Sequence, residues 1–139
     1  MKILTTVAGS RAGVDFFASL LDQHPEIIQF PGTLRANNNL INILSQNSLE
    51  NVALSFYKNY QHFFDSRIKD EKNSARLERH DCLGDTKKEY YLVNYDKFFK
   101  KFIEISKHKF SIFKNNQKIE RLINIHKAYC LASGENINE

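Results

Sequence analysis

This chain of 139 residues contains few of the residues that build covalent or metal-bound frameworks: two cysteines, two prolines, five glycines and no tryptophan. Cys82 and Cys130 lie far apart, and neither stands in a CxxC pair or beside a cluster of other ligands. A structural zinc ion needs about four ligands at defined spacing, so the sequence predicts no metal site. We expect both cysteines to be ordinary thiols.

Long apolar runs and blocks of like charge are absent as well. A helix that spans a bilayer needs about 20 apolar residues, far more than any run in this sequence, and no signal peptide is evident. We therefore expect a cytoplasmic protein without a membrane partner. The formal net charge of +4 mildly favours an anionic partner. The basic residues are spread among acidic ones, so no nucleic-acid partner is expected.

At the start of the chain, short apolar runs alternate with turn residues and one amphipathic stretch. Ile3–Ala8 predicts a buried strand, residues 9–13 a loop, residues 15–23 a helix, and Ile27–Phe30 a second strand. Strand, loop, helix, strand is the order of a βαβ unit, whose two strands are parallel. The first 32 residues therefore predict the α/β fold class.

After Gly32 the spacing of apolar residues predicts mainly helices, at about residues 34–46, 49–65, 97–108 and 116–133. Ser48 is the predicted N-cap of the second helix, and Gly134 the residue that ends the last one. The aromatic residues between 56 and 64 are expected to be core, or an interface with a missing half. Residues 65–89 hold 14 charged residues in 25 and predict an exposed connection.

The sequence also predicts which side of two of these helices faces the core. In the first of them this side holds Leu40, Ile41 and Leu44. In the last helix it holds Ile119, Leu122, Ile123, His126 and Cys130. A histidine on an apolar side is expected to be a core residue with its polar atoms satisfied.

The predicted sheet is incomplete. One βαβ unit supplies two strands, too few for a stable open sheet, and a parallel sheet needs cover on both faces. We therefore interpret residues 1–139 as a single domain that forms the N-terminal part of a larger one. The Phe-rich helices of such a part would leave apolar surface exposed, so a tendency to self-associate is expected.

The loop Gly9-Ser10-Arg11-Ala12-Gly13 has features of an anion-binding site. A helix N-terminus presents free N–H groups and a partial positive charge, and glycines let the backbone approach an anion closely. The guanidinium of Arg11 is suited to phosphate or sulfate oxygens. The loop is not a Walker A motif, because it has no Gly-Lys pair followed by Ser or Thr. The same composition also fits a simple tight turn.

The longer stretch from Gly9 to Ile27 resembles the start of sulfotransferases. In that family a loop close to [KR]-S-G-T-T precedes a helix that ends in Leu-Asp-x-His-Pro-[DE]. Arg11 and Gly13 match the loop, and residues 21–26, Leu-Asp-Gln-His-Pro-Glu, match the helix end. The resemblance covers about residues 1–32. It implies a P-loop-like α/β fold and transfer of a sulfuryl group from 3′-phosphoadenosine 5′-phosphosulfate to the hydroxyl or amine of a small-molecule or glycan acceptor.

The resemblance also implies a set of site residues. The 5′-phosphosulfate would be held by Gly9, Ser10, Arg11, Ala12, Gly13, Val14 and Asp15. Arg11 would be catalytic, because it would stabilise the charge on the bridging oxygen as the sulfuryl group leaves. No base and no ligands of the 3′-phosphate can be assigned, so we expect these 139 residues alone to be inactive.

Two alternatives stay open. The chain could be a non-catalytic helical interaction module, in which the loop is only a turn and the aromatic stripes bind a partner. It could also be another P-loop-like phosphate-binding enzyme, although the missing Lys-[ST] pair argues against this.

Overall fold

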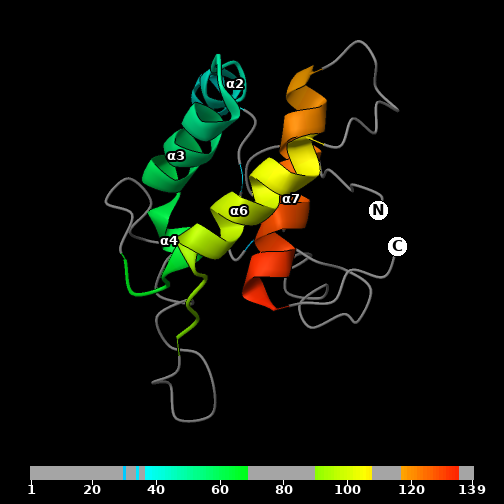
Figure 1. The fold of residues 1–139 in the computed structure, drawn as a ribbon. Coiled ribbons are helices and arrows are strands. Elements are labelled where there is room, and N and C mark those ends of the chain that lie inside the picture. The colour runs from blue at the N-terminus through cyan, green and yellow to red at the C-terminus, as the bar shows by residue number, and fades with distance from the viewer. Residues whose placement is uncertain (1–29, 31–33, 35–36, 69–89, 108–116, 135–139) are drawn as a thin grey trace, which may run out of the picture.

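The computed structural model describes Phe30, Leu34 and residues 37–68, 90–107 and 117–134. In these residues Figure 1 shows the helices α2 (Asn38–Leu44), α3 (Leu49–Asn59), α4 (Gln61–Phe64), α6 (Tyr95–Lys107) and α7 (Gln117–Ser133). Helix α6 packs along α7, α3 contacts α6, and α2 contacts both α3 and α7. The helices share one hydrophobic core. None of these described helices is both long enough and apolar enough to cross a membrane.

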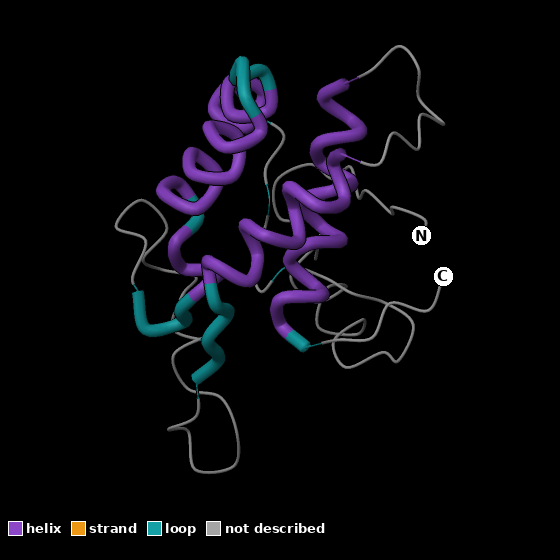
Figure 2. The backbone as a smooth tube through the Cα atoms, in the orientation of Figure 1, coloured by secondary structure: helices purple, strands orange, loops and turns teal. Residues whose placement is uncertain are grey.

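The predicted α/β fold class, with its P-loop-like βαβ unit, is wrong. Figure 2 shows helices and loops in the described part of the chain and no strand, and the extended backbone there pairs in a single antiparallel bridge between Asp65 and Leu92. Phe30, predicted to end the second strand, is not in a strand, and only 7% of its surface is exposed within the helical core. A short apolar run does not by itself distinguish a strand from another buried segment. The rest of the predicted βαβ unit lies outside the described residues.

The helix ends follow local side-chain chemistry. The Ser48 Oγ accepts a hydrogen bond of 3.1 Å from the Asn51 amide, and the Asn94 Oδ1 accepts one of 2.9 Å from the Lys97 amide. Each bond satisfies an amide that has no partner within its helix. Gly134 follows α7 with a φ of +94°, a left-handed conformation that glycine adopts without steric cost. The predicted roles of Ser48 and Gly134 are confirmed.

The helix predicted over residues 49–65 is interrupted at Tyr60. This residue has φ −131° and ψ 38°, and it separates α3 from α4. Its amide still donates to the Phe56 carbonyl at 3.0 Å, so α3 ends without losing that bond. The change of direction after Tyr60 lets two adjacent side chains, Phe63 and Phe64, both enter the core.

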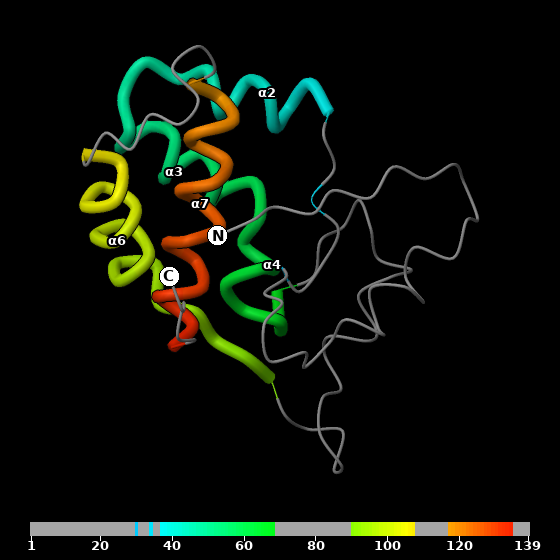
Figure 3. The backbone as a smooth tube through the Cα atoms, turned by 90° about the vertical axis from the view of Figure 1, so that its right-hand side faces the viewer, coloured from blue at the N-terminus to red at the C-terminus, as the bar shows by residue number. Residues whose placement is uncertain are grey.

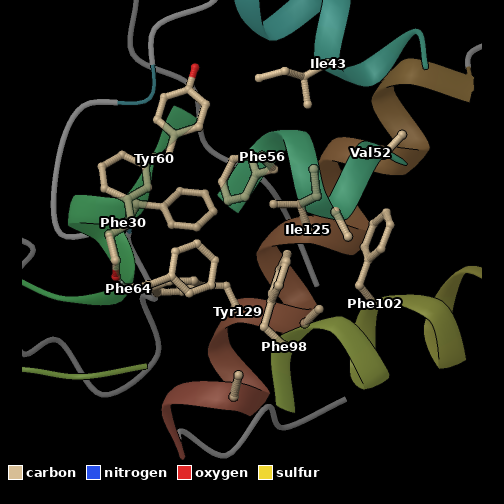
Figure 4. Close-up of a cluster of buried hydrophobic side chains, with 14 of the residues drawn as sticks. Phe30, Ile43, Val52, Phe56, Tyr60, Phe64, Phe98, Phe102, Ile125 and Tyr129 are labelled. Carbon is tan, nitrogen blue, oxygen red and sulfur yellow. Dashed lines mark hydrogen bonds between the residues drawn. The ribbon is translucent and has the colours of Figure 1, made fainter. Parts of the chain in front are cut away.

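The core is built largely from aromatic rings. Figure 4 shows side chains from α3, α4, α6 and α7 pointing toward one another around Phe56. Phe56 is fully buried, and five ring centroids lie 4.9–6.5 Å from its own, those of Phe30, Tyr60, Phe63, Phe64 and Phe98. Burying one such side chain contributes about 1.5–3 kcal/mol. The expectation that the aromatic residues between 56 and 64 are core is confirmed.

The buried sides of α2 and α7 differ from the predicted ones. Ile41 and Ile119, both predicted to face inward, are 44% and 41% exposed. Ile43 takes the inner position in α2. The buried residues of α7 are Arg121, Asn124, Ile125, Ala128, Tyr129, Cys130 and Ala132. The prediction placed no arginine or asparagine on the buried side, so it missed a face that includes one of each.

The prediction of an exposed connection over residues 65–89 is wrong for Ser66, one of its first residues. Ser66 is 1% exposed, its amide donates to the Tyr91 carbonyl at 3.3 Å, and its Oγ accepts from the Tyr91 amide at 3.2 Å. The Val93 amide donates to the Phe64 carbonyl at 2.7 Å. These bonds fasten the segment before α6 to the end of α4. Residues 69–89 lie outside the described residues.

Candidate functional site

The site predicted from the sequence lies in a part of the chain that the structure does not describe. This holds for every residue of the predicted anion-binding loop: Gly9, Ser10, Arg11, Ala12, Gly13, Val14 and Asp15. The helix end that carries the rest of the sulfotransferase resemblance, residues 21–26, lies outside the described residues as well. The described residues therefore bring none of these side chains together, and the roles assigned to them stay predictions.

Phe30 is the described residue that lies nearest to this loop in the sequence. Its ring stacks on Phe63 of α4, with 5.2 Å between centroids and 15° between planes. It also meets two residues of α7, Tyr129 edge-on at 4.8 Å and His126 at 4.2 Å. Contacts of this kind between rings add to the free energy gained by burial. Phe30 therefore fixes the end of the sulfotransferase-like segment to the helical core.

His126 lies on α7 beside the Phe30 ring. Burial in this apolar surrounding disfavours the charged imidazolium and lowers the pKa of His126 to about 4. The ring is therefore neutral at neutral pH and supplies no positive charge for an anionic ligand. His126 is half-buried, so the expectation of a core histidine is met only in part.

Two tyrosine hydroxyls bind the backbone of α4. The Tyr129 hydroxyl donates to the Phe63 carbonyl, and the Tyr91 hydroxyl donates to the His62 carbonyl at 2.9 Å. Burial raises the pKa of Tyr91 well above its ordinary value, so this hydroxyl keeps its proton. Both tyrosines act as hydrogen-bond donors that hold α4 against α7 and against the segment before α6.

Arg121 is a further polar residue of the described core, and its burial was not predicted from the sequence. Its side chain is almost fully buried, with 6% of the residue exposed. The Nη1 atom donates to two carbonyls at 2.7 Å each, those of Leu44 and Gln46. The first is the last residue of α2, where the helix dipole favours a positive charge. Arg121 therefore closes the end of α2 from a helix more than seventy residues away in the sequence.

A second polar side chain is buried near Arg121 along α7. Asn124, three residues further on, is 8% exposed, and its Nδ2 donates to the Ser106 Oγ of α6 at 3.2 Å. Residues three apart on a helix share a side, so Arg121 and Asn124 form one polar stripe within an otherwise apolar face. The sequence does contain a signal for this stripe. Arg121 and Asn124 are polar, stand three residues apart in a predicted helix, and have apolar neighbours.

The described residues hold no group of three or more histidine, cysteine, aspartate or glutamate side chains placed to bind a metal ion. Comparisons with protein-family models, with curated proteins and with solved structures gave no match to this chain.

Proposed function

We propose that this protein is a sulfotransferase, which moves the sulfuryl group of 3′-phosphoadenosine 5′-phosphosulfate to the hydroxyl or amine of an acceptor. The observation that carries the proposal is a double match in the sequence. Arg11 and Gly13 agree with the family's loop, and residues 21–26 agree with the family's helix end. The match is fairly specific because the loop and the helix end agree together. The same resemblance implied the P-loop-like α/β fold, which the described helices contradict, so the proposal rests on this sequence match alone.

In this proposal the donor's 5′-phosphosulfate is bound by backbone amides of residues 9–15 and by Arg11. The acceptor atom attacks sulfur, the bond between sulfur and the bridging phosphate oxygen breaks, and the acceptor loses its proton. The products are the sulfated acceptor and adenosine 3′,5′-bisphosphate. Arg11 offsets the negative charge that develops on the bridging oxygen. Phe30 supports the proposal as an anchor, since it holds the end of this segment in the core.

The first test measures the binding of adenosine 3′,5′-bisphosphate by ligand-observed NMR, because we expect the affinity of these 139 residues to be low. We expect weak, saturable binding that the sulfuryl donor competes away. Arg11→Ala should weaken it about tenfold or more, since a charge-assisted hydrogen bond contributes about 1.5–3 kcal/mol. Equal binding by the wild type and Arg11→Ala would remove Arg11 from the site.

Arg67→Ala is the matched control for Arg11→Ala. It removes the same guanidinium from a bidentate pair with Asp65, in which the side chains of Arg67 and Asp65 are 55% and 18% exposed. The variant loses this pair and the contact of Arg67 with the Tyr90 ring, so a thermal melt is used to show that it still folds, and its binding should be unchanged. Transfer itself is measured with radiolabelled donor against a panel of hydroxyl and amine acceptors, and these 139 residues alone should show none.

The second candidate is a non-catalytic helical interaction module. The helical character of all described elements favours it. A parallel titration with adenosine separates the two proposals, because a module of this kind would not distinguish adenosine 3′,5′-bisphosphate from adenosine. The cytoplasmic location, the tendency to self-associate and membership of a larger domain stay predictions.

A further inference from the structure

We draw no further inference here: the strongest candidate, the surface patch of Tyr90 and Leu92 on the extended segment before α6 (Figure 3), is 51% and 63% exposed at these two residues, and nothing in the described part of the structure shows what covers it.

Discussion

The rings of Phe30 and His126 lie 4.2 Å apart, centroid to centroid, and this contact joins the end of the sulfotransferase-like segment to the last helix. The titratable group in this contact is the His126 imidazole. Its charged form is disfavoured in the same apolar surrounding that holds Phe30. The stability of the helical core should therefore depend on the protonation of one histidine.

The first prediction concerns pH. The pKa of His126 is about 4 in the folded state and near 6.5 when the residue is exposed. Between these values the unfolded state binds more protons, so the free energy of unfolding is constant above the upper value and falls as the pH drops through the window. We expect a loss of about 2 kcal/mol between about pH 7.5 and about pH 5, measured by urea unfolding.

Other groups also titrate in this range, so His126→Gln serves as the reference. Its side chain stays neutral, and the free energy of unfolding should fall by about 2 kcal/mol less over the same pH interval. The comparison uses the difference between two pH values within each protein, so a uniform loss of stability in His126→Gln does not affect it. Parallel pH profiles for the two proteins would show that His126 is not the group responsible.

A second prediction concerns the hydroxyl of Tyr129, which donates to the Phe63 carbonyl inside the core. Tyr129→Phe keeps the ring and removes this bond, so the free energy of unfolding should fall by about 1–2 kcal/mol. Tyr57→Phe is the control. The Tyr57 ring packs on Tyr95 at 4.4 Å, and no described residue bonds to its hydroxyl, so its effect should stay within about 0.5 kcal/mol. Equal losses in both variants would mean that the hydroxyl bond contributes nothing specific.

Local signals in the sequence predicted the helical part of the chain well. Ser48 marks the start of α3, and Gly134 the end of α7, because capping depends on residues within one turn. Phe56 and Phe63 were placed in the core by their spacing, and both are fully buried. These predictions needed no knowledge of what packs against each helix.

Features that depend on distant partners could not be predicted in this way. Arg121 is buried because carbonyls at the end of α2 receive its donors, and that pairing spans more than seventy residues. Phe30 was placed in a strand because it ends a short apolar run, whereas rings from α3, α4 and α7 hold it in the core. The break at Tyr60 likewise serves tertiary packing, since helical spacing continues through it. The predicted site in residues 9–15 depends on a sequence match that these packing contacts do not address.

The last prediction concerns the N-cap of α3. The Ser48 Oγ accepts the Asn51 amide at 3.1 Å, and Ser48→Ala leaves that amide to water, so the free energy of unfolding should fall by about 1 kcal/mol. Ser55→Ala makes the same change within the same helix, where alanine is the better helix former, so stability should be unchanged or slightly higher. Both variants are measured by urea unfolding, with amide hydrogen exchange at Asn51 as a local probe. Exchange at Asn51 should accelerate in Ser48→Ala and stay as it is in Ser55→Ala. A loss of stability in Ser55→Ala as large as that in Ser48→Ala would show that the cap does not set the start of this helix.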